Sequence, residues 1–368
     1  MEGKTHMAHV SGILADSDIQ ALIDNGILKA SWPFETSQIQ PASLDLRLGD
    51  KAYRIRASFM PGADVKVFDK LERLKLHEFD LQDGAVLETG CVYIVPLLEN
   101  LALPEILAAV ANPKSSTGRL DIFTRVITDN AQEFDKVCAG YHGPLYLEIS
   151  PRTFPILVRT GSRLSQLRFR KGCSYLNETD LYALHTNETL ISDDLPNISA
   201  GGIGLSINLK GDENGLVGYR GKRHASVIDI DKRAAFHVLD FWEPLFDRDQ
   251  RELILDPDEF YILVSRESIH VPPLYAAEMT PFDPLVGEFR VHYAGFFDPG
   301  FGHMETGGKG AKAVLEVRSH EVPFILEHGQ MIGRLMYEHM LHQPLTLYGY
   351  KAGSHYQAQE LKLSKHFK

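Results

Sequence analysis

The feature that most constrains this chain is an internal repeat: residues of the first half recur 168 positions later in the second half. Tyr93 and Ile94 match Tyr261 and Ile262, and the offset holds over roughly eighty residues, so chance is a poor explanation. The other matched pairs are Leu87 and Leu255, Pro104 and Pro272, Ala108–Ala109 and Ala276–Ala277, Leu147–Glu148 and Leu315–Glu316, Pro155 and Pro323, Gly161 and Gly329, and Leu167 and Leu335.

The repeat continues upstream with a different gap, since SLDLRLGD (43–50) resembles SINLKGD (206–212). The chain is therefore expected to be a tandem duplication. We place the join in the polar stretch NETLISDDLPNISAGG, near residue 190, which predicts a first domain of residues 1–190 and a second of residues 191–368. A length of 368 residues suits two domains that each bury a core of their own.

Composition and charge exclude several classes of protein. The net charge of −11 argues against a nucleic-acid partner, although a local basic pocket for one small polyanion remains compatible with it. Cys91, Cys138 and Cys173 are widely spaced and odd in number, which argues against disulfides or a cysteine-rich zinc site and suits a reducing cytoplasm. No stretch approaches the ~20 apolar residues of a membrane span, and the first residues lack a signal-peptide pattern.

The local patterns are mostly those of β-strands. CVYIVPLL, PLYLEI, FPILVRTG, EFYILVS and AVLEVRS all alternate with period two, and turn formers recur between such segments. Two short helices are predicted, one over ADSDIQALIDNGIL with Asp16 or Ser17 as its N-cap, and one over PEILAAVAN after Pro104. No glycine-rich nucleotide loop follows a strand. The sequence thus predicts two mainly-β domains, as in antiparallel barrels or sandwiches, with little helix.

The stretch KSSTGR (114–119) raises a choice between an ordinary polar turn and a phosphate-binding turn. Hydroxyls of Ser115 and Ser116, backbone N–H groups and the Arg119 guanidinium would together supply the donors that a phosphate needs, while serines in a solvated turn bond their own backbone. The copy of this stretch, PFDPLVG (281–287), lacks the serines and the arginine. A feature kept in one repeat only is not needed for the barrel, which favours function.

The second half holds a complementary stretch, HYAGFFDPGFG (292–302), which could be a packed hairpin or a ligand loop. Small residues such as Ala294 allow a flat ring to approach the backbone, and the carboxylate of Asp298 can accept from a hydroxyl. Phe297 and Phe301 offer apolar faces for a base or sugar. The first half has only a blurred counterpart, DKVCAGYHG, with a cysteine in place of the aspartate.

Two matched glutamates, Glu148 and Glu316, interrupt apolar strands in LYLEI and AVLEV. A glutamate on a strand usually faces solvent, but one placed beside a pocket can act as a general base and acid. The polar tail AGSHYQAQELKLSKHFK either frays or folds over a ligand as a lid.

Taken together, these stretches resemble the dCTP deaminase branch of the dUTPase superfamily, in a double-length form. The opening ILADSDIQALIDNGIL with PFETSQIQPASLDLRLGD resembles the N-terminal signature of that family, and KSSTGRL resembles its phosphate and water-positioning motif. HYAGFFDPGFG with VLEV resembles its base-and-sugar loop and glutamate strand, and HYQAQELKLSK resembles its lid. One departure is Ala294-Gly295-Phe296, where the family commonly has Ala-His-Arg, and this version leans toward dUTPases.

The resemblance implies a distorted, jelly-roll-like β-barrel and a homo-oligomer with a trimer-like arrangement of domains whose active sites lie between domains. Because the first copy keeps the Ser-Ser-Arg motif and the second keeps Asp298 and Glu316, we expect the two copies to form complementary halves of one site. Glu148 is then a relic or a structural residue, and it is the alternative catalytic residue if the roles of the halves are reversed. The resemblance implies catalysis by Glu316, Ser115 and Arg119, and substrate binding by Lys114, Ser116, His292, Ala294, Phe297, Asp298, Phe301, Tyr356, Gln359 and Lys362.

The implied reaction is hydrolytic deamination of dCTP to dUTP and ammonia, feeding dUMP and dTTP synthesis. Water activated by a glutamate would attack the ring, and Mg²⁺ would arrive on the triphosphate without protein ligands. The His-x-Glu and Pro-Cys-x-x-Cys arrangement of zinc deaminases is absent, so no zinc is expected in the chemical step. Two alternatives stay open: a dUTP pyrophosphatase or bifunctional enzyme, and a non-catalytic nucleotide-binding regulator.

Overall fold

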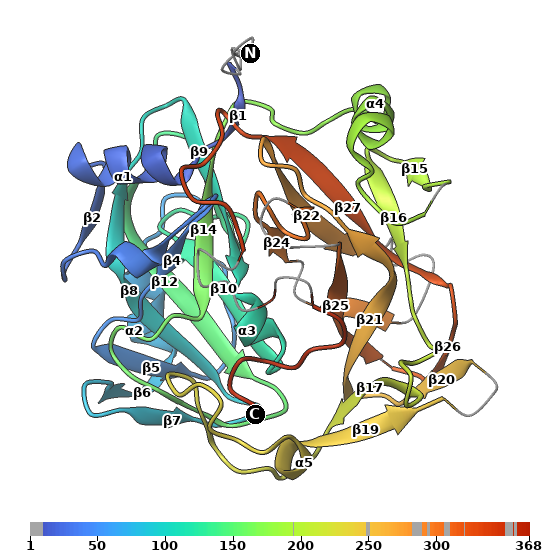
Figure 1. Ribbon diagram of the computed structural model, residues 1–368. Helices are drawn as coiled ribbons and strands as arrows, with labels where there is room; N and C mark the ends of the chain where they lie inside the picture. Colours follow the sequence, from blue (N-terminus) through green and yellow to red (C-terminus); the bar gives the residue numbers. More distant parts are fainter. Residues whose placement is uncertain are drawn as a thin grey trace.

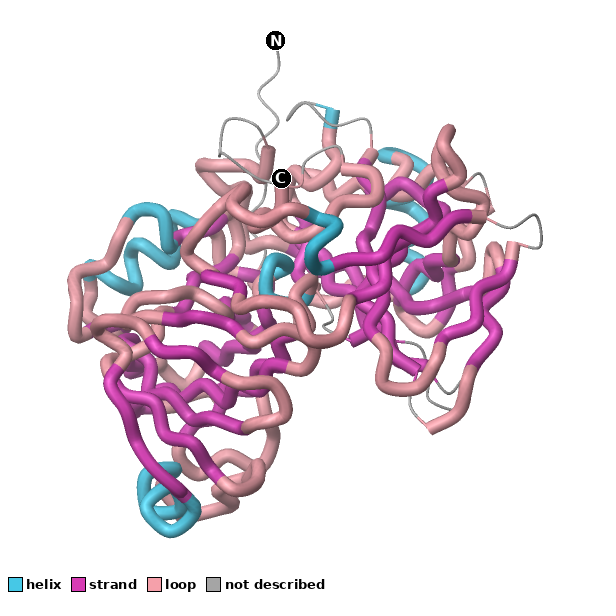
Figure 2. Tube along the Cα trace, turned by 90° about the horizontal axis from the view of Figure 1, so that it is seen from below, coloured by secondary structure: helices cyan, strands magenta, loops and turns pink. Residues whose placement is uncertain are grey.

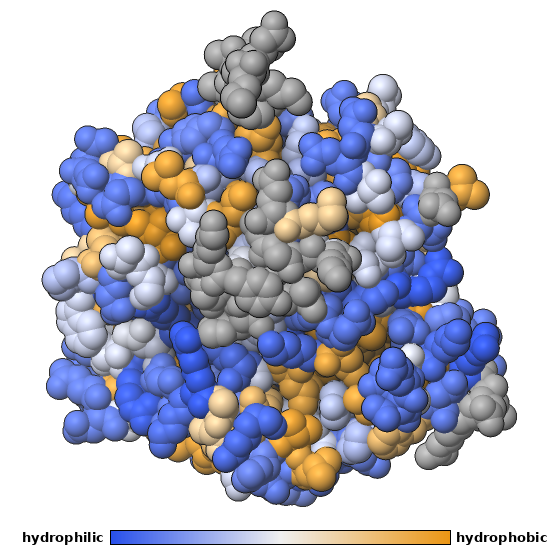
Figure 3. All heavy atoms as spheres, in the orientation of Figure 1, coloured by the Kyte–Doolittle hydropathy of each residue, from blue (hydrophilic) through white to orange (hydrophobic). Residues whose placement is uncertain are grey.

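The chain folds into two β-barrels that lie side by side, one built mainly from each half of the sequence (Figures 1 and 2). This computed structural model is mainly β, and each barrel is distorted and jelly-roll-like, as predicted. On the face shown in Figure 3, hydrophilic residues cover most of the described surface. The structure describes residues 10–193, 195–247, 251–281, 289–292, 295–304, 310–319, 321–349, 356 and 359–368.

Three sheets form the first barrel, with strand orders β11-β9-β14-β4-β3, β10-β12-β8-β5-β6 and β18-β13-β7. Strand β1 also pairs with β14, and β2 with β8. The strands are β1 (Gly12–Ile13), β2 (Leu28–Ala30), β3 (Ile39–Gln40), β4 (Ser43–Leu46), β5 (Lys51–Ile55), β6 (Lys75–Asp80), β7 (Ala85–Leu87), β8 (Val92–Ala102), β9 (Leu107–Pro113), β10 (Ile122–Thr128), β11 (Lys136–Val137), β12 (His142–Pro151), β13 (Ile156–Val158), β14 (Ser165–Lys171) and β18 (Ile228–Asp229).

The second barrel repeats this plan, with strand orders β15-β16-β27-β22-β24, β19-β17-β21-β25-β23 and β20-β26. Its strands are β15 (Ile198–Ser199), β16 (Gly202–Ser206), β17 (Leu216–Gly221), β19 (Trp242–Phe246), β20 (Glu252–Leu255), β21 (Phe260–Ile269), β22 (Tyr275–Pro281), β23 (Phe289–His292), β24 (Phe296–Phe297), β25 (Ala311–Ser319), β26 (Phe324–Glu327) and β27 (Met331–His339).

The two barrels agree in register as well as in strand order. In the first, Glu148 of β12 lies opposite Ile94 of β8. In the second, Glu316 of β25 lies opposite Ile262 of β21, which is the same pair moved by the sequence offset. The duplicated fold read from the sequence is therefore confirmed, and it places the two glutamates at equivalent positions.

Helix α1 (Asp16–Asp24) forms where the sequence predicts it, but the predicted N-cap residue is wrong. The cap residue is Ala15, and Asp16 is already helical, so neither Asp16 nor Ser17 caps the helix. The Asp16 carboxylate instead accepts hydrogen bonds from backbone N–H groups of residues 345–346, far along the chain. The other helices are the 3₁₀ turn η1 (Thr36–Gln38), α2 (Val67–Leu74), α3 (Ser115–Gly118), α4 (Glu178–Glu188) and α5 (Val238–Phe241).

The helix predicted over PEILAAVAN is wrong, because this stretch forms strand β9. Its backbone pairs with β14 over seven residues, and the buried Ala109 and Ala111 face the core. Alanine has the highest helix propensity of any residue, but helix propensity is a small energy, and the tertiary pairing with β14 outweighs it.

The two barrels pack against each other through buried apolar contacts along their interface, which we call the seam. Strand β18, from the second half, pairs in parallel with β13 of the first barrel. Trp242 and Phe260 pack in the same buried cluster as Phe154, and burial of side chains of this size contributes ~1.5–3 kcal/mol each. This packing fixes how the two barrels face each other, and so it determines which side chains meet at the seam.

Candidate active site

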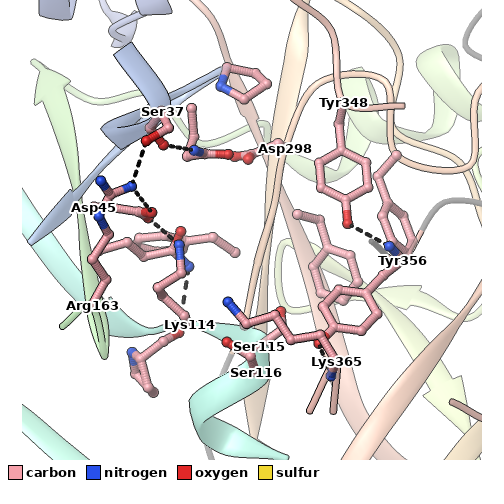
Figure 4. Close-up of a pocket in the computed structure, with 18 of the residues that line it drawn as sticks. Ser37, Asp45, Lys114, Ser115, Ser116, Arg163, Asp298, Tyr348, Tyr356 and Lys365 are labelled. Carbon is pink, nitrogen blue, oxygen red and sulfur yellow. Dashed lines mark hydrogen bonds and ion pairs between the residues drawn. The ribbon is translucent and has the colours of Figure 1, made fainter. Parts of the chain in front are cut away.

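A cavity of about 1100 Å³ lies at the seam and is lined by both halves of the chain. The first half contributes α3 and the residues around it, and the second contributes the loop after β24, strand β25 and the C-terminal segment (Figure 4). Of the predicted site residues, those that line it are Lys114, Ser115, Ser116, Arg119, Phe297, Asp298, Phe301, Glu316, Tyr356 and Gln359.

The KSSTGR stretch folds as a short helical turn rather than an open loop. The N–H groups of Thr117 and Gly118 donate to the Lys114 carbonyl, and the Thr117 hydroxyl donates to the carbonyl of Leu164. These bonds hold the turn against the barrel and leave the two serines on the cavity wall (Figure 4). The Lys114 ammonium forms an ion pair with Asp45, which lies in the SLDLRLGD signature.

Arg119 is buried at the centre of the cavity wall and joins the two halves. Its guanidinium donates to the carbonyl of Lys362 (2.8 Å) and to Oε1 of Gln359 (3.0 Å). Its Cζ lies 3.9 Å from the centre of the Tyr356 ring, a cation–π contact. Its Nε lies 4.0 Å from Oε1 of Glu316. The anion turn of one repeat and the glutamate of the other thus meet within one chain.

Glu316 is only 5% exposed, and burial raises its pKa to about 8, an effect that the Arg119 guanidinium partly opposes. On its strand, Glu316 lies opposite His292 of β23. A carboxyl group of this kind exchanges its proton close to neutral pH, which is what a group acting as both base and acid requires.

Asp298 is held by an arginine that the sequence reasoning missed. Nη2 of Arg168, a fully buried residue of β14, lies 3.1 Å from Oδ1 of Asp298. Burial raises the pKa of Asp298, and the arginine opposes that shift. Phe297 and Phe301 pack edge to face at 5.1 Å, so this end of the cavity combines an apolar wall with one acceptor. The available signal for Arg168 was a charge within a strand flanked by apolar residues.

A second group of missed residues makes one end of the cavity cationic. Arg163 and Lys365 line it together with Lys114 (Figure 4), and Arg233 also lines the cavity. Burial lowers the pKa of Lys365 to about 8, and repulsion from Lys114 and Arg233 adds to this. A lysine whose charge is disfavoured by neighbouring cations is suited to bind an anion, because the anion removes that repulsion.

A second charge pair crosses the seam beside the first. Nη2 of Arg318 lies 2.5 Å from Oδ2 of Asp121, and both residues are buried. Arg318 stands two positions after Glu316 on β25, and Asp121 stands two positions after Arg119. The cation comes from the first half of the chain in one pair and from the second half in the other. Together they fix the distance between the anion turn and the glutamate strand.

Other predicted residues lie elsewhere. Glu148 does not line the cavity, and its carboxylate is bound within its own barrel by Arg125 at 2.6 Å. The backbone carbonyl of Lys362 accepts a hydrogen bond from Arg119. The tail lysine that lines the cavity is Lys365. Ala294, the side chain of His292 and most of the copied stretch PFDPLVG lie outside the described residues.

These features define a protein of the duplicated dUTPase-like barrel class with one charged cavity where its two halves meet. Two family models cover nearly the whole chain: the 2′-deoxycytidine 5′-triphosphate deaminase N-terminal domain matches residues 10–173, and the corresponding C-terminal domain matches residues 177–367. The chain belongs to the dCTP deaminase family, and it is an enzyme that acts on the cytosine amino group.

Similar proteins agree with this assignment. The crystal structure of 2′-deoxycytidine 5′-triphosphate deaminase from Agrobacterium tumefaciens is 70% identical, has a TM-score of 0.87, and covers 91% of this chain and 100% of its own. A "dCTP deaminase, dUMP-forming" from Aquifex aeolicus is 34% identical over 43% of this chain and 81% of its own length. The protein of that name from Streptomyces coelicolor is 32% identical over 42% of this chain and 78% of its own length. Among the described residues, no helix has the length and apolar character needed to span a bilayer.

Proposed function

We propose that this enzyme deaminates dCTP hydrolytically, with Glu316 as the group that moves protons. The observation that carries the proposal is the 4.0 Å approach of Arg119 to a buried glutamate whose pKa is raised to about 8, inside a cavity large enough for a nucleotide. Raised pKa values in a cleft are typical of acid–base catalysts.

In the proposed reaction, Ser115 and Arg119 hold a water beside the ring and the Glu316 carboxylate takes its proton. The hydroxide adds to C4 of cytosine, and Glu316 passes protons to the ring nitrogen and to the departing amino group. The C4–N bond breaks, ammonia leaves, and the ring becomes uracil, so that dCTP and water give dUTP and ammonia. The base therefore needs to lie over β25, beside the His292 backbone.

Substrate binding follows from the two ends of the cavity. We assign the sugar to the apolar end, where the Asp298 carboxylate accepts from its hydroxyl and Phe297 disfavours a 2′-hydroxyl. We assign the triphosphate to the cationic end, to Lys114, Ser116 and Arg119. Lys365 fits the same role and takes the place of the Lys362 side chain in this proposal.

We propose that Mg²⁺ enters with the triphosphate and neutralises part of its charge. The Asp45 carboxylate at the cationic end is already paired with Lys114 and lies 3.7 Å from Arg163. It is therefore not needed as a ligand of Mg²⁺. The cavity wall thus offers cations for the phosphate oxygens, and the protein would bind the metal only through its substrate.

A second candidate is a bifunctional enzyme that also cleaves dUTP to dUMP and pyrophosphate. Two observations favour it: the curated relatives carry the description "dUMP-forming", and Ala294-Gly295-Phe296 departs from the usual deaminase sequence toward dUTPases. In that case a water bonded to Asp298 would be directed at phosphorus after the ring has been deaminated.

The test is incubation with dCTP and Mg²⁺, followed by assays for ammonia, dUTP, dUMP and pyrophosphate. We expect ammonia in every case, with dUTP from a simple deaminase and with dUMP and pyrophosphate from a bifunctional one. Glu316→Gln should bind dCTP yet lose at least about a thousandfold in kcat. Glu148→Gln is the matched control, the same change at the equivalent position of the other repeat, and should keep its activity. An inactive Glu148→Gln beside an active Glu316→Gln would refute the assignment.

A further inference from the structure

Outside the cavity, two histidines and a glutamate form a compact cluster. Ligand atoms of Glu188, His270 and His303 all lie within 4.8 Å of one another, and the centres of the two imidazole rings are 4.6 Å apart. Glu188 ends helix α4 (upper right in Figure 1), His270 follows strand β21, and His303 follows the loop that carries Asp298. None of the three lines the cavity. We propose that this cluster binds one divalent transition-metal ion, with Zn²⁺ the best match.

The first argument is the protonation of His270. Its Nδ1 lies 3.0 Å from the carbonyl oxygen of Glu188 and 3.3 Å from that of Thr189. A carbonyl only accepts, so Nδ1 carries a proton, and in the neutral ring, the form that binds metals, Nε2 then has the lone pair. That Nε2 is buried and has no hydrogen-bond partner within the described part of the chain. A histidine that donates from one nitrogen to a backbone carbonyl and presents the other unpaired has the usual arrangement of a metal ligand.

The second argument is that the backbone fixes both histidines in place. The N–H of His270 donates to the Leu190 carbonyl at 2.9 Å, and its carbonyl accepts from the Tyr337 hydroxyl at 2.7 Å. The loop before His303 passes so close to β21 that a Cβ on Gly302 would lie 2.1 Å from the Ile269 carbonyl oxygen. Only glycine permits this approach, and its φ of 68° is one that other residues rarely adopt. The two imidazoles are therefore brought together by fixed backbone.

The third argument is chemical. Two imidazoles and one carboxylate form a known zinc ligand set, and a water completes four-coordination. Zinc bonds of this kind place neighbouring ligand atoms about 3.3 Å apart, so the ligand atoms of the cluster would have to approach by at most roughly 1.5 Å. Because Glu188 is exposed at the end of its helix, rotation of its side chain can bring its carboxylate toward the two imidazoles, and small rotations of the rings would supply the rest.

The cluster is also particular to the second repeat. The sequence offset places Ala102 at the position equivalent to His270, so the barrel itself does not require a histidine there. A bound ion would tie the end of α4 to the loop that carries Asp298 and Phe301. The ion would lie outside the cavity and apart from the deamination, so this inference does not depend on the proposed mechanism.

The experiment uses the full-length enzyme, stripped with a chelator and titrated with Zn²⁺ in the absence of nucleotide. We expect one Zn²⁺ per chain by calorimetry and by metal analysis, and a rise in Tm on binding. His270→Ala and His303→Ala should each weaken binding at least about tenfold, whereas His142→Ala, at an exposed strand residue, should not. Co²⁺ should give the visible absorption of a four-coordinate site in the wild type and in His142→Ala only.

Glu188→Gln keeps the test valid if the histidine variants fail to fold, because this exposed side chain leaves the barrels untouched. It should fold normally and bind Zn²⁺ at least about tenfold more weakly. The absence of stoichiometric Zn²⁺ uptake by the wild type would overturn the proposal. Uptake that Glu188→Gln and the histidine variants leave unchanged would also overturn it.

Discussion

At the scale of single residues, the same glutamate has opposite surroundings in the two barrels. Glu148 meets Arg125, whose guanidinium packs against the rings of Phe123 and Phe134 and binds its carboxylate directly. Among the side chains that the structure describes, the cation beside Glu316 is Arg119 of the other repeat, at 4.0 Å. The Glu148 carboxylate is thus bound by an arginine of its own barrel, whereas Glu316 has a raised pKa and faces a cavity.

Two groups in the cavity lead us to expect a narrow pH optimum near 8. Below that pH, kcat/KM for dCTP should rise with pH, because Glu316, with a pKa of about 8, accepts a proton only as a carboxylate. Above it, kcat/KM should fall, because Lys365 also has a pKa of about 8 and loses the charge that attracts the triphosphate. Profiles measured from pH 6 to 10 check this.

Lys365→Arg provides the control for this profile, since a guanidinium stays charged throughout the range. The variant should keep the acidic limb and lose the alkaline fall. A kcat/KM that does not change between pH 6 and 9 would contradict both assignments.

The raised pKa of Glu316 also predicts a cost in stability. Between the pKa of the unfolded chain, near 4.5, and about 8, the folded protein holds a proton that the unfolded chain has lost, so this residue lowers the free energy of unfolding as pH rises. Glu316→Gln, which cannot ionise, should therefore gain about 2 kcal/mol relative to the wild type between pH 6 and 8.5. Urea unfolding at both pH values measures this gain, and a constant difference would contradict it.

At the scale of secondary-structure elements, the spacing between α3 and β25 depends on the buried pair of Asp121 and Arg318. The change Asp121→Asn leaves that guanidinium without its carboxylate, which should cost about 3 kcal/mol of stability. Because Arg119 and Glu316 flank this pair, kcat should also fall by at least about tenfold. Thermal unfolding and steady-state kinetics measure the two effects.

The exposed pair of Arg220 and Glu243 supplies the control for that substitution. The change Arg220→Met should cost less than about 1 kcal/mol, because exposed ion pairs contribute little, and should leave kcat unchanged. If Asp121→Asn behaved like this surface variant, the pair would have no role in positioning the two elements.

The last ten residues, 359–368, show how a segment with a weak sequence signal is held by side-chain contacts. The Ser364 hydroxyl donates to the Ser116 carbonyl, and Nε2 of His366 lies 2.8 Å from the Ile230 carbonyl oxygen. Burial lowers the pKa of His366 to about 4, so its ring is neutral at neutral pH. These contacts return the tail to the seam and explain how Gln359 and Tyr356 reach Arg119.

At the scale of the whole molecule, one chain contains both halves of the proposed site. Co-expression of Arg119→Ala and Glu316→Gln chains, followed by purification of mixed assemblies, should therefore restore no activity, because every site keeps one defect. Mixtures of wild-type and Arg119→Ala chains, as the control, should keep activity in proportion to the wild-type content. Activity in the mixed mutants well above either parent would mean that sites form between chains. The trimer-like arrangement of domains, the homo-oligomer and the cytoplasmic location stay predictions.

The boundary between the repeats also belongs to this scale. The predicted join near residue 190 stays a prediction. Leu181 and Leu184 of α4 pack in the core of the second barrel, and the two family models change over between residues 173 and 177. We therefore propose that the second unit begins just before α4. The polar composition that suggested residue 190 marks an exposed connection, which is a weaker sign of a boundary than shared burial.

The sequence by itself determined the duplication, most of the strands, and the anion turn and glutamate strand as separate features. Alternation and short motifs act over a few residues, so they can be read without a structure. Only the tertiary structure decided that residues 107–113 form a strand and that Arg168 pairs with Asp298. It also decided that Arg125 pairs with Glu148, and that Lys365 and Arg233 line the cavity together with Lys114. Each of these depends on side chains brought together from distant segments by the packing of two barrels, and that packing is fixed by complementary shape and burial rather than by any local pattern.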